Sequence, residues 1–196
     1  MTKSLILAGG CFWCVEHDLR SAPGVSLVTS GYSGGDKDEK GLLVRSNSTT
    51  SEIVNSPTYE NHKGHKEVVL VEYDEEITTY KKLIQFFIDH IDPTDDGGQF
   101  GDRGESYTTA IFYKDEEERL SAKLILAELD DSHVYDSPSK IELLPRQHFY
   151  PAEEYHQEYA EKNPLKYDLY RNGSGREAFV AKTCQIREEK KISWKV

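Results

Sequence analysis

Hydrophobic side chains recur along this chain with two periods, one typical of helices and one typical of strands. After Thr79 they return every three or four positions, which predicts an amphipathic helix with Thr78 or Thr79 as its N-cap. The apolar positions of that helix are Tyr80, Leu83, Ile84, Phe87, Ile88 and Ile91. The helix is expected to end at Asp92-Pro93, and the β-branched, partly alternating run 67–73 before it predicts a strand.

The first half of the chain is predicted to alternate strands and helices in one particular order. Six elements are expected, in the order strand, helix, strand, strand, helix, strand: 4–8, 12–21, 25–30, 67–73, 80–91 and 107–113. This is the split βαβ order of ferredoxin-like folds. We therefore expect an α+β fold, a two-layer sandwich with helices on a ferredoxin-like core sheet. The turn after the first strand is expected at an edge of that sheet, with the long loops nearby.

The rest of the chain predicts further elements and long loop excursions. Two more helices and a strand are expected at 115–130, 153–162 and 141–144. The polar stretch 36–56 is predicted to be a surface insertion, and 94–106 a glycine-rich loop. A C-terminal tail is expected from about residue 165. Without repeats or a domain linker, residues 1–196 are predicted to form a single domain.

Composition and charge exclude several classes of partner. The chain has 196 residues, 30% of them charged, and a net charge of −11, so no nucleic acid partner is expected. No apolar run is long enough to cross a membrane, and 5–8 is too short for a signal peptide, so a cytoplasmic protein is predicted. In that compartment the three cysteines are expected to be redox-active rather than structural.

The most informative motif is the run Gly9-Gly10-Cys11-Phe12-Trp13-Cys14. It follows an apolar strand and opens a predicted helix, so Cys11 is expected at the helix N-terminus. Unpaired backbone N–H groups and the helix dipole favour a thiolate there. The two glycines leave room for a substrate to approach. The motif therefore predicts a nucleophilic cysteine.

Other interpretations of these residues remain open at this level. Cys11 could be a buried apolar residue, or half of a zinc site, although the chain holds no second C-x-x-C. A thioredoxin-like dithiol–disulfide exchange by Cys11 and Cys14 is the alternative function, because C-x-x-C at a helix start has that form. A binding module that uses the tyrosine-rich loops would leave the cysteine motif unexplained.

A reactive cysteine needs partners, and two loops supply candidates. Glu67 stands at the start of an apolar strand, where burial would raise its pKa and let it donate a proton to a departing oxygen. Asp102 and Tyr107 flank the glycine-rich loop, and Tyr59 follows Pro57 in the other loop. Phenols and protonated carboxyls that face a thiolate suit a substrate with a basic oxygen next to a soft electrophile.

Taken together, these motifs make the chain similar to the A-type peptide methionine sulfoxide reductases. The resemblance extends from residue 4 to about 176, in order. It rests on Gly10-Cys11-Phe12-Trp13, Gly31-Tyr32-Ser33-Gly34-Gly35, Pro57-Thr58-Tyr59, Gly64-His65-Lys66-Glu67, Asp92-Pro93-Thr94, Gln99-Phe100-Gly101-Asp102-Arg103-Gly104, Tyr107, Phe149-Tyr150-Pro151-Ala152-Glu153, His156-Gln157 and Lys162-Asn163-Pro164.

The resemblance implies a role for each candidate residue. Cys11 is the thiolate that attacks the sulfoxide sulfur, and Phe12 and Trp13 form the apolar pocket for the S-methyl group. Glu67 protonates the sulfoxide oxygen, and three further residues polarise that oxygen directly or through water: Tyr59, Tyr107 and Asp102.

The resemblance also implies the course of the reaction. The products are methionine and a sulfenic acid on Cys11, which a second thiol must reduce. The substrate is the S epimer of methionine sulfoxide, in proteins or free, and the reaction repairs oxidised proteins. Neither a metal nor an organic cofactor is expected, and thioredoxin is the expected reductant.

The chain departs from the family pattern in its recycling cysteine. The C-terminal Gly-Tyr-Cys-Gly segment of many members is absent, so Cys14, Cys184 or no internal thiol resolves the sulfenic acid. On a helix, Cβ atoms three residues apart lie about 5–6 Å from each other, and a disulfide needs about 3.5–4.5 Å. Slight unwinding of the first helical turn closes this gap, so Cys14 is favoured over Cys184.

Overall fold

The computed structural model describes residues 1–35 and 56–189 of the chain. The predicted insertion 36–56 lies outside the described residues except for Ser56. That the whole chain forms a single domain stays a prediction.

Six strands form one mixed sheet, in the order β7-β6-β1-β3-β2-β8. Their bounds are β1 (Thr2–Ala8), β2 (Val25–Ser33), β3 (Lys66–Asp74), β6 (Ala110–Tyr113), β7 (Glu142–Pro145) and β8 (Tyr150–Pro151). The inner strands β6, β1, β3 and β2 are antiparallel neighbours, which confirms the predicted ferredoxin-like core. β7 adds to this core parallel to β6, and β8 adds antiparallel to β2.

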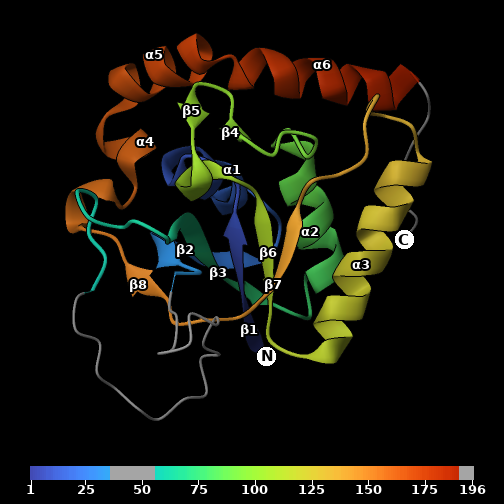
Figure 1. Ribbon diagram of the computed structural model, residues 1–196, viewed down its shortest axis with the longest axis horizontal. Coiled ribbons are helices and arrows are strands. Elements are labelled where there is room, and N and C mark those ends of the chain that lie inside the picture. Colours follow the sequence, from blue (N-terminus) through green and yellow to red (C-terminus); the bar gives the residue numbers. More distant parts are fainter. Residues whose placement is uncertain (36–55, 190–196) are drawn as a thin grey trace.

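Helices pack on one face of this sheet (Figure 1): α1 (Phe12–Arg20), α2 (Tyr80–Asp89) and α3 (Glu116–Asp131). The Thr79 side chain accepts a hydrogen bond from the Lys82 amide at the start of α2, and Asp115 accepts one from Glu118 at the start of α3. The apolar stripe of α2 is buried at the predicted spacing: Leu83, Ile84, Phe87 and Ile88.

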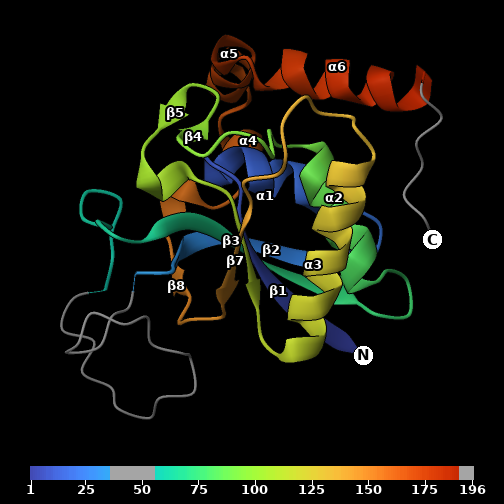
Figure 2. The same cartoon turned by 45° about the vertical axis from the view of Figure 1, so that its right-hand side comes forward.

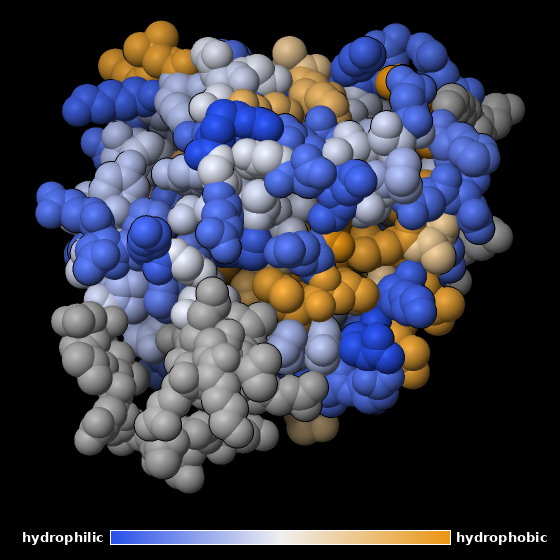
Figure 3. Space-filling view, viewed as in Figure 1, coloured by the Kyte–Doolittle hydropathy of each residue, from blue (hydrophilic) through white to orange (hydrophobic). Residues whose placement is uncertain are grey.

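The two faces of the sheet bury different residues of the same strands. Leu5 and Leu7 of β1 lie in the large core under the helices, whereas Ile6 and Ala8 belong to a smaller cluster on the other face. A sheet with its main helical layer on one side is the expected two-layer sandwich. The face seen in Figure 3 is largely hydrophilic, and its hydrophobic side chains lie in a band below the middle and in smaller patches at the top.

Three predictions about the elements were wrong in part. β1 lies between β6 and β3, so the Cys11 turn follows an interior strand and not an edge strand. The expected strand 107–113 begins only at Ala110, because a short 3-10 helix, η1 (Glu105–Tyr107), precedes it. The loop 94–106 contains a small hairpin of β4 (Gly98–Gln99) and β5 (Asp102–Arg103).

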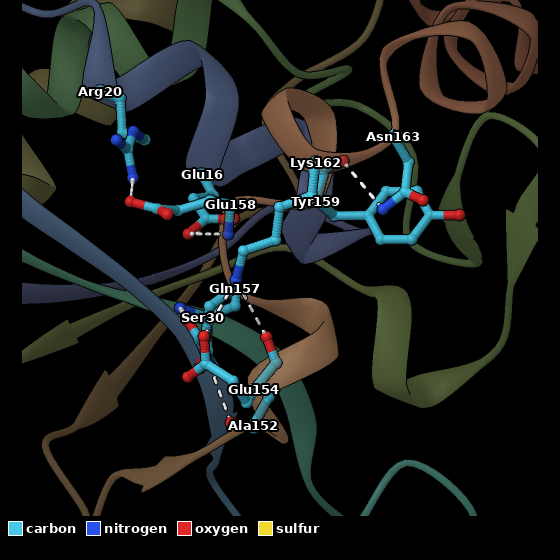
Figure 4. Close-up of polar contacts among 10 residues, drawn as sticks. All are labelled: Glu16, Arg20, Ser30, Ala152, Glu154, Gln157, Glu158, Tyr159, Lys162 and Asn163. Carbon is cyan, nitrogen blue, oxygen red and sulfur yellow. Dashed lines mark hydrogen bonds and ion pairs between the residues drawn. The ribbon is translucent and has the colours of Figure 1, made fainter.

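The expected helix 153–162 is broken into two short pieces, η2 (Glu154–His156) and α4 (Tyr159–Lys162). Glu158 between them has a left-handed backbone with φ 54°. Its amide donates to both carboxylate oxygens of Glu16 at 3.0 Å, and its side chain pairs with Arg20 at 2.8 Å (Figure 4). Contacts with α1 therefore override the local helical preference.

The predicted tail folds into two helices, α5 (Pro164–Ser174) and α6 (Arg176–Glu189). Gly175 makes the corner between them with φ 89°, a left-handed conformation that glycine adopts without strain. Figures 1 and 2 show that α5 and α6 run across the end of the molecule that lies away from the N-terminus. This end carries the candidate site.

Candidate active site

Cys11 lies at the turn between β1 and α1, as the motif predicts. It is the N-cap residue of α1, and its carbonyl accepts hydrogen bonds from the amides of Cys14 and Val15. Gly10 before it has φ 81°, and a Cβ there would come within 2.5 Å of Gln99 Cβ. Only glycine fits this tight approach, and it places the Cys11 side chain where β1 ends.

The strand register brings two candidate partners to the same place. Leu7 of β1 lies opposite Val69 of β3, and Ala8 lies opposite Ala110 of β6. Strand β1 is antiparallel to both β3 and β6. The residues that follow β1 therefore lie beside the first residues of β3 and beside the residues that precede β6. Glu67 and Tyr107 occupy those two positions.

The hairpin β4–β5 and helix α5 supply another pair of side chains. Asp102 lies in β5, and its carboxylate accepts a hydrogen bond from the phenol of Tyr170 on α5. Tyr170 also hydrogen-bonds Cys11 and stands edge-on to Trp13, with ring centroids 5.9 Å apart. Tyr59 comes from the segment before β3, and its ring lies 4.6 Å from that of His156.

The apolar side of the site is built by Phe12 and Trp13. Phe12 is buried, and its ring lies 5.8 Å from that of Tyr32. The Trp13 indole stacks on Tyr159 at 3.7 Å and donates its N–H to Nδ1 of His156 at 3.0 Å. The indole is therefore held in one orientation.

The segment behind Trp13 is fastened to the rest of the protein (Figure 4). The Gln157 side chain donates to the carbonyls of Ser30 and Ala152 and accepts from the Ser30 amide, at 2.9 Å in each case. Together with the Glu16–Glu158 bonds, these contacts fix both ends of the turn between His156 and Tyr159. The wall of the pocket thus rests on β2 and α1.

Eight residues of the site surround one small cavity of about 100 Å³. It is lined by Cys11, Phe12, Trp13, Tyr59, Glu67, Asp102, Tyr107 and Tyr170. A cavity of this volume accommodates a small group such as a methyl sulfoxide. The structure therefore brings together every predicted catalytic and substrate-binding residue.

Glu67 is a buried carboxyl with a strongly altered pKa. Its side chain is 2% exposed, and burial raises its pKa to about 8, although the Phe12 amide donates to one oxygen at 3.0 Å and favours the anion. The carboxyl of Asp102 raises the pKa further. Glu67 is thus largely protonated at neutral pH, and the predicted direction of its shift is confirmed.

The two cysteines of the motif are buried and share a hydrogen bond. Burial raises the pKa of Cys11 well above its usual range, and a hydrogen bond to Cys14 raises it further. The same hydrogen bond, helped by Arg176 and Arg171, lowers the pKa of Cys14 to about 7. Burial of the helix N-terminus thus opposes its expected effect on Cys11, and that Cys11 reacts as the thiolate stays a prediction.

The candidate resolving cysteines lie in different surroundings. Cys14 is fully buried beneath the site, in a cluster with Ala160 and Tyr167. Cys184 is exposed on α6 and does not line the cavity. In residues 1–35 and 56–189, no group of three or more His, Cys, Asp or Glu side chains could hold a metal ion.

Sequence reasoning assigned no role to three residues that lie at the site: Tyr170, His156 and Tyr159. Tyr170 reaches the cavity only because α5 folds back over the sheet end, and nothing in its spacing predicts that. His156 and Tyr159 lie on either side of the break in the expected helix 153–162. The prediction of one continuous helix therefore gave the wrong relative position for these two side chains. The signals present in the sequence were the motif His156-Gln157 and the aromatic residues of the second half of the chain.

A cysteine at a helix N-terminus and a protonated carboxyl that line one small cavity, on a ferredoxin-like sheet, fit a thiol-dependent oxidoreductase. The family profile described as peptide methionine sulfoxide reductase matches residues 3–188. The chain belongs to the peptide methionine sulfoxide reductase family, and it is an oxidoreductase that reduces methionine sulfoxide. This membership decides against the thioredoxin-like alternative.

The similarity extends over most of the chain in several relatives. Peptide methionine sulfoxide reductase MsrA 2 of Staphylococcus aureus is 42% identical over 185 residues, which are 92% of this chain and 95% of that protein. The MsrA/MsrB protein of Vibrio cholerae is 44% identical over 174 residues, 89% of this chain but 43% of the longer relative.

Solved structures share the fold. Reduced Mxr1 of Saccharomyces cerevisiae is similar with a TM-score of 0.67 and 28% identity, over 83% of this chain and 86% of that one. Mxr1 has also been solved in complex with Trx2, with a TM-score of 0.52 and 22% identity over 81% of this chain and 85% of that chain. In the part of the present chain that the structure describes, no helix is long and apolar enough to cross a membrane.

Proposed function

We propose that Cys11 reduces the S epimer of methionine sulfoxide, with Glu67 as the acid. The observation that carries this proposal is the buried carboxyl of Glu67, which keeps its proton near neutral pH in the cavity that holds Cys11. Cys11 attacks the sulfoxide sulfur while Glu67 protonates the sulfoxide oxygen. The oxygen passes to Cys11 as a sulfenic acid and methionine leaves, so one sulfur is reduced by two electrons and the other oxidised by two.

The remaining lining residues orient the substrate. Phe12 and Trp13 provide the apolar surface for the S-methyl group, and the indole orientation held by His156 gives that surface a defined shape. Tyr59 and Tyr107 line the same cavity, and burial raises the pKa of both phenols, so they remain donors. We assign to them and to Asp102 the polarisation of the sulfoxide oxygen.

Cys14 is the proposed resolving thiol. The two thiols share a hydrogen bond, so the Cys11 proton passes to Cys14 as Cys11 attacks. After Cys14 loses that proton, its thiolate attacks the sulfenic sulfur, the S–S bond forms and the S–O bond breaks. The hydroxide leaves as water with a proton from a neighbouring acid. Cys184 is the second candidate for this role.

An external dithiol must then reduce the Cys11–Cys14 disulfide. The yeast relative Mxr1 has been solved with Trx2, and we infer that a thioredoxin serves this chain as well. A cytoplasmic location, with its reducing thiol pool, fits this requirement and stays a prediction.

The decisive experiment is an assay with separated S and R epimers of a methyl sulfoxide and dithiothreitol as reductant. Dithiothreitol removes the dependence on a protein reductant, so the assay reports on Cys11 chemistry alone. Reduction of the S epimer only is expected, and it should vanish in Cys11→Ser. Equal rates on both epimers would contradict the proposed geometry.

A further inference from the structure

Glu158 is a strained residue beside the active site. It is not a glycine, yet its backbone has φ 54° and ψ 35°, in the left-handed region that side chains disfavour. Such a conformation persists only where surrounding contacts hold it, and it is common at functional sites. Its neighbours contact the Trp13 indole: Tyr159 stacks on it at 3.7 Å, and His156 accepts its N–H at 3.0 Å. The strained turn therefore helps to determine where the indole lies.

The contact that holds Glu158 in this conformation is its amide bond to Glu16. Both carboxyl oxygens of Glu16 lie 3.0 Å from the Glu158 nitrogen, and Glu16 is 2% exposed (Figure 4). A hydrogen bond from an amide to a carboxylate is stronger than one between neutral groups. The ion pair of the Glu158 side chain with Arg20 lies nearer the surface, where such pairs contribute little. Glu16 is therefore the main support of this backbone conformation.

Glu16 and Trp13 lie on the same side of α1, because residues three apart in a helix are neighbours on its surface. One helical turn thus carries both the indole and the carboxylate that holds the indole's neighbours. The contacts form a closed ring, from Trp13 through Tyr159 and the Glu158 amide to Glu16 and back along α1. Gln157 attaches the same turn to β2. A closed ring of this kind prevents the indole from swinging away from the cavity.

We infer that Glu16 is a positioning residue that sets the size selectivity of the site: by holding the Glu158 turn it fixes the Trp13 indole, so that the cavity accepts an S-methyl group and discriminates against a larger S-alkyl group. This inference rests on the proposed function, in which Phe12 and Trp13 receive the S-methyl group. The cavity that they line has a volume of only about 100 Å³, so a small displacement of the indole changes what fits. Glu16 does not line this cavity, and it acts through the turn alone.

The first test measures selectivity between the S epimers of methionine sulfoxide and ethionine sulfoxide, which differ by one methylene on the S-alkyl group. An apolar pocket discriminates one methylene by about 10–200-fold in kcat/KM. Glu16→Gln keeps the volume but removes the charge and one acceptor oxygen, so it should lower this ratio roughly tenfold. Adding Glu158→Gly should restore part of the ratio, because glycine adopts the left-handed backbone without strain.

Glu118 provides a matched control. It is also a buried glutamate, with 8% exposure, and its carboxylate also accepts a backbone amide, that of Lys114 at 2.8 Å. It lies on α3 and does not line the cavity. Glu118→Gln should therefore leave the selectivity ratio unchanged. Glu16→Asp keeps the carboxylate but withdraws it from the Glu158 amide, so it should shift the ratio in the same direction and covers the case in which Glu16→Gln fails to fold.

A second measurement needs no substrate and separates this inference from the proposed function. The chain has two tryptophans, so in a Trp194→Phe background Trp13 is the only one. Glu16→Gln should weaken the near-UV circular dichroism of the indole and increase its quenching by acrylamide, because its stack on Tyr159 loosens. Glu118→Gln should change neither signal.

The two measurements decide different points. An unaltered protein that reduced neither sulfoxide would refute the proposed function, and the indole signals would still show whether Glu16 positions Trp13. Indole signals in Glu16→Gln equal to those of the unaltered protein would overturn the inference. So would an unchanged selectivity ratio in an active Glu16→Gln protein.

Discussion

The backbone amide of Phe12 donates a hydrogen bond of 3.0 Å to the carboxyl of Glu67, 55 residues away in the sequence. This bond fixes the carboxyl beside the first turn of α1, where Cys11 is the N-cap. It engages one carboxyl oxygen as an acceptor, so the proton of the acid form resides on the other oxygen. The contact thus holds the turn that carries Cys11 next to the proposed acid, Glu67.

Glu67→Gln is expected to slow methionine formation in a single turnover by roughly two to four powers of ten, the scale of a positioned proton donor. The rate of the unaltered protein should fall as pH rises through about 8, where Glu67 loses its proton. Glu72→Gln, on the same strand but outside the cavity, should have no such effect. An unchanged single-turnover rate in Glu67→Gln would transfer the acid role to another residue.

The same carboxyl affects stability with a definite sign. The folded-state pKa of Glu67 is raised from 4.5 to about 8, so the native protein holds this proton more tightly than the unfolded chain does. Its contribution to stability is full below pH 4.5 and is lost as pH rises through about 8. Glu67→Gln should therefore flatten the decline of the free energy of unfolding over this range, measured by urea unfolding at several pH values. A parallel decline in both proteins would contradict the raised pKa.

Cys11→Ser is expected to abolish reduction of methionine sulfoxide while the fold persists, because serine has the same shape as cysteine, is only slightly smaller and lacks the nucleophilic sulfur. Circular dichroism checks the fold and the sulfoxide assay checks activity. Cys184→Ser is the matched control, since its thiol is exposed on α6. Full activity in Cys11→Ser would remove Cys11 from the reaction.

Tyr170→Phe should slow the first step about tenfold at neutral pH. In the structure the single O–H of the phenol is donated to Asp102; donated instead to the Cys11 thiolate, it lowers the pKa of that thiol, and a hydrogen bond to an ionised group contributes about 1.5–3 kcal/mol. The ring remains against Trp13, so the apolar wall of the pocket is preserved. Single-turnover rates against pH should show the alkaline shift of Cys11 ionisation. A profile identical to that of the unaltered protein would restrict Tyr170 to packing.

The resolving thiol is identified by mass spectrometry after one turnover without reductant. We expect a cross-linked peptide that joins Cys11 to Cys14, because Cys14 lies next to Cys11 and its pKa is lowered to about 7. A Cys11–Cys184 cross-link would reverse the assignment. A lasting sulfenic acid on Cys11 would mean that neither thiol resolves it.

The sequence alone determined the parts of this protein that depend on neighbours along the chain. The apolar period of α2, the N-cap at Thr79 and the Gly10–Cys11 turn follow from local chemistry, and the structure agrees with all three. The order of the first six elements was sufficient for the ferredoxin-like core, because few topologies are compatible with it. Glu67 was also found, since a carboxyl at the start of an apolar strand is expected to be buried.

The tertiary structure alone decided how deeply the two cysteines are buried and which side chains close the site. Ionisation depends on burial and on distant charges, and the hydrogen bond from Arg176 to Gly9 joins residues 167 positions apart. Tyr170 reaches Cys11 only through the packing of α5 over the sheet end, and the break at Glu158 exists because Glu16 binds its amide. Local periodicity contains no information on such contacts, because their energy arises only when separate segments meet in the folded chain.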